Sequence, residues 1–173
     1  MTNPIVCDHM NEASRCLTKI NEQLSHYLDE HYMEKLLHEE GSKNRAYYKE
    51  VLKALRRLEV ISDEALDAVK KNLRSNCEQE QMAKKTLYGI YHKCILEFYA
   101  PKNDSWYEDS RASYTRSESI RFRNMPPRSV AQLVYTLDRS FQIMRDQFSD
   151  YESIETGTSP IRKHNSASIK QNS

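Results

Sequence analysis

Two pairs of metal-binding residue types stand out in the sequence, Cys7 with His9 and His92 with Cys94. A set of two cysteines and two histidines is a common zinc-binding combination. The members of each pair are two residues apart, and on a helix this spacing points their side chains about 200° away from each other. The predicted order of the helices also leaves Cys94 near the opposite end of the molecule from the first pair. The sequence therefore predicts no metal site.

The histidines are candidates for acid and base catalysis, but none has a suitable partner. His31 lies on the predicted apolar face of a helix, where a histidine is more often a hydrogen-bonded core residue than a base. Glu34 and His38 are four residues apart, whereas di-iron bundles use Glu-x-x-His pairs. The sequence contains no glycine-rich phosphate loop, no HExxH and no GxSxG motif. We therefore predict a protein that is not an enzyme and has no cofactor, with a pocket that holds His38 or His92 beside a carboxylate as the enzymatic alternative.

The composition is typical of one helical domain inside the cell. The chain has 173 residues, of which 38% are hydrophobic and 29% charged, and only three are glycines, fewer than a sheet protein needs for its turns. The net charge of +1 gives no general attraction to nucleic acid or to acidic membranes. No apolar run approaches the roughly 18 residues of a membrane span, and the N-terminus lacks a basic segment followed by an apolar one. We therefore predict a cytoplasmic protein whose cysteines are thiols: Cys7, Cys16, Cys77 and Cys94.

Apolar residues recur at steps of three and four along four segments, which predicts four helices. The first follows Asn3-Pro4 and ends at Gly41, the second runs from about Asn44 to Leu73, the third opens with Ser75 and Glu78 and ends before Pro101, and the fourth opens with Ser129 and Gln132 and continues to Tyr151. The short connections between the first three imply antiparallel neighbours. The predicted fold is all-α, an antiparallel four-helix up-and-down bundle over residues 1–153, with an ordered insertion at 101–128 and a disordered tail at 154–173.

The insertion between the third and fourth helices is long, and an ordered connection of this length usually has a function. Its aromatic residues favour order, because disordered linkers are usually poor in them. Ile120 and Phe122 alternate with polar residues, which is typical of a short extended piece or a small hairpin. The first two helices are longer than the others, so their connection, here named the helix tip, should overhang and meet this insertion.

Charge is uneven in the insertion, since five arginines are opposed from residue 111 onward by Glu118 alone, a balance of +4. These arginines are Arg111, Arg116, Arg121, Arg123 and Arg128. Guanidinium groups beside aromatic rings are typical of contact sites for a protein surface, a phosphate or single-stranded nucleic acid. The structural alternative is that the arginines pair with Asp104, Glu108 and Asp109 and with the acidic first helix.

Part of the sequence is similar to a known family. The segment Tyr91-His92-Lys93-Cys94, then PKNDSWYEDSR at 101–111 and Pro126-Pro127, resembles the YpuI-like family of small proteins from spore-forming bacteria. The resemblance extends from the first predicted helix through the fourth and excludes the tail. The family is uncharacterised, so the resemblance implies a bacterial cytosolic origin and an ordered 101–128 segment, and it implies no activity.

The leading functional prediction is a non-enzymatic interaction protein that holds a protein partner, or a second copy of itself, through the insertion and the helix tip. The candidate contact residues are Trp106, Tyr107, Arg111, Tyr114, Arg121 and Arg123 from the insertion, with Tyr47 and Tyr48 from the tip. The alternative is a binder of phosphate or nucleic acid that uses the same arginines, and nucleic acid is the less favoured partner. No membrane partner is predicted.

Overall fold

A computed structural model describes residues 3–41, 43–109, 111 and 119–152, which are mostly helical. The helices are α1 (Pro4–Glu30), α2 (Met33–Glu40), α3 (Arg45–Arg74), α4 (Glu80–Gly89), α5 (Leu96–Tyr99) and α7 (Arg128–Phe148). A π-helical segment, Ile90–Ile95, joins α4 to α5, and a 3-10 turn, Ser149–Tyr151, follows α7. Strands β1 (Trp106–Glu108) and β2 (Ile120–Phe122) pair antiparallel in the insertion. The predicted helical class is therefore confirmed in its broad form, with a small sheet added.

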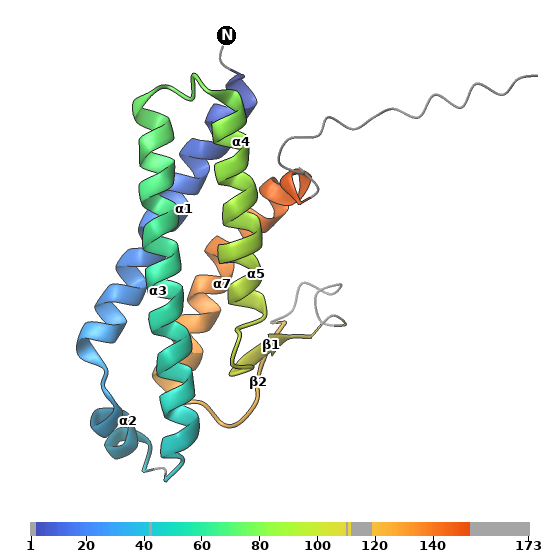
Figure 1. Ribbon diagram of the computed structural model, residues 1–173. Helices are drawn as coiled ribbons and strands as arrows, with labels where there is room; N and C mark the ends of the chain where they lie inside the picture. The colour runs from blue at the N-terminus through green and yellow to red at the C-terminus, as the bar shows by residue number, and fades with distance from the viewer. Residues whose placement is uncertain (1–2, 42, 110, 112–118, 153–173) are drawn as a thin grey trace, which may run out of the picture.

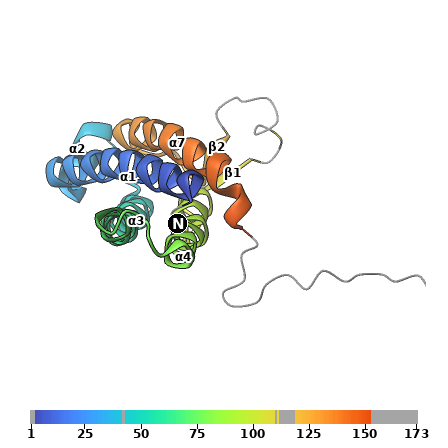
Figure 2. The same ribbon diagram turned by 90° about the horizontal axis from the view of Figure 1, so that it is seen from above.

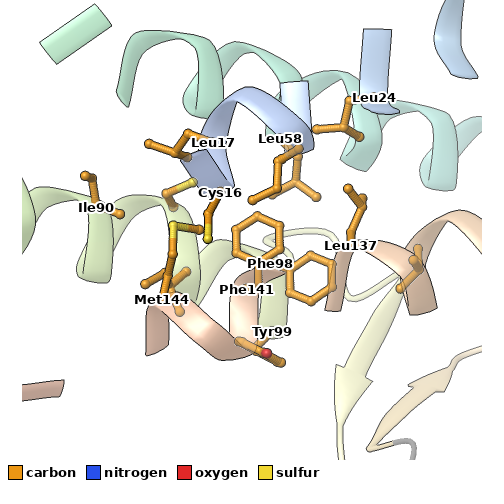
Figure 3. Packing of buried hydrophobic residues seen from close by; sticks show 14 of the residues in the cluster. Cys16, Leu17, Leu24, Leu58, Ile90, Phe98, Tyr99, Leu137, Phe141 and Met144 are labelled. Atoms are coloured by element: carbon orange, nitrogen blue, oxygen red, sulfur yellow. The ribbon is translucent and has the colours of Figure 1, made fainter. Parts of the chain in front are cut away.

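The long helices lie side by side around one apolar core (Figures 1 and 2). Helix α1 contacts α3, α4 and α7, and the π-helical segment contacts α3 and α7. At the centre, Phe98 and Phe141 stack with ring centroids 4.2 Å apart, beside Leu58 and Met144 (Figure 3). Removal of this apolar surface from water is the main force that holds the helices together.

The first predicted helix ends at Gly41 as expected, but it is divided into two helices. Residues 31 and 32 have extended backbone, and α2 starts anew at Met33. The His31 ring stacks on Tyr27 at 4.0 Å, and its Nδ1 lies 2.9 Å from the Tyr27 carbonyl oxygen. The change of direction lets α2 bury Leu36, and Gly41 then ends α2 with a φ of 58°, a conformation that glycine adopts without steric cost.

The second predicted helix is confirmed as one continuous element, α3. Asn44 is its N-cap, and the side-chain oxygen accepts a hydrogen bond from the backbone N–H of Tyr47 at 3.3 Å. Ser62 is fully buried in the middle of this helix, and its hydroxyl lies 3.5 Å from the Cys94 sulfur.

The predicted helix starts at Ser75 with Glu78 and at Ser129 with Gln132 imply two capping boxes, and neither forms. Ser75 ends α3 instead of starting the next helix, because the backbone turns through positive φ at Asn76 and Cys77, and α4 begins only at Glu80. The N-cap of α7 is Pro127, two residues before the expected N-cap Ser129, and the Ser129 hydroxyl contacts the Tyr27 hydroxyl at 2.8 Å instead of capping the helix.

Two further predictions concern membrane-spanning helices and the C-terminal tail. No helix in the described ranges is long and apolar enough to cross a membrane. The predicted tail, residues 154–173, lies outside the described residues.

Candidate functional site

The insertion presents two different faces through its hairpin. Trp106 pairs with Phe122, Tyr107 with Arg121, and Glu108 with Ile120. Because side chains alternate along a strand, Trp106 and Ile120 point inward and are fully buried, whereas Tyr107 and Arg121 point outward and are exposed. The hairpin stands at the side of the molecule next to α5 and α7 (Figures 1 and 2). Its outer face is the candidate site.

Trp106 anchors the hairpin, which corrects its prediction as a contact residue. The indole is fully buried, and its Nε1 donates a hydrogen bond to the carbonyl oxygen of Phe98 at 2.7 Å. Its ring lies 6.3 Å from that of Phe98 and 6.2 Å from that of Phe122. A buried indole with its single donor satisfied is a structural residue, so a partner cannot reach it.

The helix tip and the insertion meet, as predicted. The Tyr47 hydroxyl donates to the Ser105 carbonyl at 2.9 Å, and the Asn103 side-chain amide donates to the Glu50 carbonyl at 2.7 Å. These bonds bury Tyr47, and Tyr48 is buried beside it. Both tyrosines were predicted as contact residues, and both are corrected to internal packing residues.

A polar cluster that the sequence reasoning missed fastens the hairpin to α7. The Arg145 guanidinium donates to both carboxylate oxygens of Glu108, at 2.7 and 2.9 Å, and lies 3.8 Å from the centre of the Tyr99 ring. The Tyr99 hydroxyl donates to Asp138 at 2.8 Å. Three elements, β1, α5 and α7, are joined through these side chains. The sequence signal for this cluster was Asp138, whose carboxylate directly follows a core leucine of the last helix. Its hydrogen-bond partners are 39 and 4 residues away, so this signal alone did not identify the cluster.

Burial raises the pKa of the Asp138 carboxyl, and hydrogen bonds from Tyr99 and Gln142 and the charge of Arg145 offset this only in part. Burial and the charge of Asp138 also raise the pKa of Tyr99, which keeps its hydroxyl protonated as a donor. The buried surroundings of Asp138 therefore favour the protonated form of its carboxyl group.

This raised pKa predicts a specific dependence of stability on pH. A carboxyl group with a higher pKa when folded binds its proton more tightly in the native state, so its contribution to stability grows as pH falls from 7 towards the ordinary range of aspartate. The unfolding free energy of the unaltered protein should therefore rise relative to that of Asp138→Asn between pH 7 and pH 5. Urea unfolding of both proteins at several pH values measures the difference, and a constant difference would contradict it.

The outer face carries the remaining predicted contact residues. Tyr107 is 54% exposed, and Arg111, Arg121 and Arg123 are exposed around it. Asp109 holds two of these residues, since its carboxylate accepts from the Arg111 backbone N–H at 3.0 Å and lies 3.9 Å from Arg121 Nε. Tyr114, the last candidate, lies outside the described residues.

The alternative that the insertion arginines pair with neighbouring carboxylates holds only in part. Glu108 pairs with Arg145 of α7, not with an arginine of the insertion. Within residues 3–41, 43–109, 111 and 119–152, the one ion pair of an insertion arginine is Arg121 with Asp109. The Arg123 side chain instead lines a cavity of about 250 Å³ with Asn103 and Asn124. Arg111, Arg121 and Arg123 are nevertheless exposed, so this face carries positive charge at its surface.

A second concave region lies between α3 and the helix formed by α4 and α5. It is a cavity of about 560 Å³ whose lining includes His92, Cys94 and Glu97. Glu97 is paired with Arg57 at 2.7 Å, and His92 Nε2 lies 2.8 Å from the Glu152 carbonyl, so that nitrogen carries the proton. Burial raises the pKa of Cys94 to about 11, which keeps it a thiol at neutral pH. These groups are committed to internal contacts and are not arranged as a nucleophile with its base.

The residues of the two pairs that were weighed as metal ligands have other partners. The Cys7 sulfur contacts the Cys77 sulfur at 3.1 Å, and His9 Nδ1 contacts the Tyr151 hydroxyl at 2.8 Å. In the part of the chain that the structure describes, no group of three or more histidine, cysteine, aspartate or glutamate residues could hold a metal ion.

Comparison with known proteins places the chain in a family. The chain is 35% identical over 162 residues to "Uncharacterized protein YpuI" of Bacillus subtilis (strain 168), and the aligned region covers 94% of this chain and 90% of that protein. No solved structure matches the chain. The resemblance drawn from residues 91–94, 101–111 and 126–127 is confirmed by this relative. Residues 10–155 match the family model described as "Protein of unknown function (DUF3907)", and the chain belongs to that family.

Proposed function

We propose that this protein is a non-enzymatic interaction protein of the bacterial cytoplasm that binds an acidic protein surface through the outer face of its hairpin. The contact residues are Tyr107, Arg111, Arg121 and Arg123. The long helices, taken as an antiparallel four-helix bundle, act as the rigid scaffold. The observation that carries the proposal is the exposed Tyr107, beside guanidinium groups, on a ribbon whose other face is fastened to the core.

Fastening of the inner face favours binding at the outer face. Trp106 and Glu108 hold β1 in one place through bonds of 2.7 Å to Phe98 and to Arg145. A side chain on an ordered ribbon loses little further freedom when it binds, so more of the contact energy appears as affinity. Tyrosine and arginine are among the residue types that are enriched at the dominant contacts of protein interfaces.

The charge of the face indicates the chemistry of the partner. Arg111, Arg121 and Arg123 are exposed on this face, and Asp109 lies 3.9 Å from Arg121, so the face carries more positive than negative charge. Complementary carboxylates on a partner would speed association and fix its orientation. An acidic protein surface therefore fits this face better than a neutral or basic one.

The test is photo-crosslinking in the native bacterium with p-benzoylphenylalanine at position 107. The matched control carries the same group at position 60 on α3, because Val60 is 56% exposed and Tyr107 is 54% exposed. A discrete protein adduct should form from position 107 and not from position 60. Equal adducts from both positions, or none from 107, would reject the proposal. A nuclease-sensitive adduct from 107 alone would favour the nucleic-acid alternative.

Replacement of Arg121 and Arg123 by alanine should reduce capture of the crosslinked partner at least tenfold, since a dominant contact is typically worth about 2 kcal/mol or more. The thermal midpoint should change by no more than about 2 °C, because both side chains are exposed. Capture is measured with the purified partner at low and high salt. A collapsed midpoint with unchanged capture would assign the arginines a structural role.

A further inference from the structure

Two cysteines from distant parts of the chain meet at the end of the molecule opposite α2. Cys7 lies near the start of α1, and Cys77 lies in the connection between α3 and α4 (Figure 1). Their sulfur atoms are 3.1 Å apart, although 70 residues separate them in sequence. An S–S bond is about 2.05 Å long, so a movement of about 1 Å would bring the sulfurs to bonding distance.

The two thiols differ in access to solvent. Cys77 is buried with 1% of its surface exposed, whereas Cys7 is only partly buried. Burial raises the pKa of Cys77 to about 11, so its sulfur is protonated and shielded at neutral pH. A small oxidant would therefore meet Cys7 first, with Cys77 in contact behind it.

The backbone holds Cys77 in this place. Asn76 and Cys77 have φ values of 50° and 55°, in the left-handed region that residues with a side chain rarely adopt. The Cys77 N–H donates to the Asn72 carbonyl at 3.0 Å, which ties the turn to the end of α3. The turn aims the Cys77 side chain at α1 rather than at solvent.

The other two cysteines have different surroundings. Cys94 is fully buried and contacts the Ser62 hydroxyl, and the buried Cys16 contacts Glu12 and Arg15 on its own helix. All four described cysteines are free thiols, and these two are buried. Cys16 and Cys94 therefore serve as internal controls for the pair formed by Cys7 and Cys77.

We propose that Cys7 and Cys77 form a reversible oxidation site that reacts with a peroxide and closes to a disulfide. In the first step the Cys7 sulfur attacks one oxygen of hydrogen peroxide, the O–O bond breaks, and Cys7 sulfenic acid and one water, which takes the thiol proton, result. In the second step the Cys77 sulfur attacks the Cys7 sulfur, the S–O bond breaks, and a second water leaves with the Cys77 proton. The two thiols lose two electrons in total and the peroxide gains them.

The disulfide would join the start of α1 to the turn between α3 and α4. Such a link restricts the unfolded chain over a loop of about 70 residues, for which the raised stability corresponds to a thermal midpoint higher by roughly 10 °C. The hairpin face lies towards the other end of the molecule (Figure 1), so this site is independent of the proposed contact surface.

The experiment treats the reduced, full-length protein with hydrogen peroxide, blocks remaining thiols under denaturing conditions and maps the peptides by mass spectrometry. A peptide that links Cys7 to Cys77, with Cys16 and Cys94 still blocked as thiols, is the expected result. The thermal midpoint should rise by roughly 10 °C and return after dithiothreitol.

Variants separate the pair from general oxidation. Cys7→Ser and Cys77→Ser should each lose the midpoint shift, whereas Cys16→Ala should keep it. The proposal is overturned if Cys7 proceeds to sulfinic acid while Cys77 remains a thiol. Linkage of Cys7 to Cys16 or Cys94, or a shift that survives Cys7→Ser, would overturn it equally.

Discussion

Trp106→Ala is expected to lower the free energy of unfolding by about 3–5 kcal/mol, the usual cost of deleting a large buried aromatic side chain. The indole is fully buried between Phe98 and Phe122, and its Nε1 satisfies the Phe98 carbonyl. The substitution leaves both a cavity and an unpaired carbonyl. The hairpin would lose its main attachment to the core.

The neighbouring residue provides the control for this experiment. Tyr107→Ala alters the next side chain of the same strand, but that side chain is exposed, so the free energy of unfolding should change by less than about 0.5 kcal/mol. Urea unfolding monitored by circular dichroism measures both variants. Both should lose the crosslinked partner, Trp106→Ala because the ribbon is released and Tyr107→Ala because the contact is gone. Similar stability losses in the two variants would contradict the assignment of the faces.

Arg145→Ala is expected to cost about 2–4 kcal/mol, because removal of one member of a partly buried charge pair leaves the other without compensation. Arg145 binds both oxygens of Glu108 and lies over the Tyr99 ring, close to Asp138. Its loss would leave two acidic groups near each other in a poorly solvated place.

Helix α7 offers a control of the same residue type. Arg139 is exposed on α7, so Arg139→Ala should change the free energy of unfolding by less than about 0.5 kcal/mol. Glu108→Gln combined with Arg145→Ala should cost less than the sum of the two single changes, because the double variant has no uncompensated carboxylate at position 108. Additive costs would show that the two residues act separately.

Several contacts attach the inner face of the hairpin and the turn before it to the helices. Trp106 supplies apolar contact, Arg145 supplies charge, and Tyr47 and Asn103 tie the preceding turn to the helix tip. The outward side chains take part in few of these bonds. They can therefore be changed with little effect on the fold, which makes the contact hypothesis testable by substitution.

Helices were predictable because their signals are local. Apolar spacing of three and four residues follows from the geometry of one turn, and Asn44 caps α3 through a bond to a residue three positions away. The alternation at Ile120 and Phe122 likewise predicted extended structure, and its partner strand emerged only in the fold. The two serines stand at the spacing of a capping box, but neither box forms, because the side chains of Ser75 and Ser129 contact other groups.

The roles of single side chains depended on contacts between segments far apart in the chain. Trp106 and Tyr107 are adjacent aromatic residues that no local pattern distinguishes, yet one is buried and the other is exposed. The partners of Arg145 and Cys77 lie 37 and 70 residues away. The order of residue types along the chain thus determined where the helices form, because helical geometry is local. The burial and pairing of single side chains were decided only by the packing of the helices and the hairpin, because each such contact needs two distant segments to lie side by side.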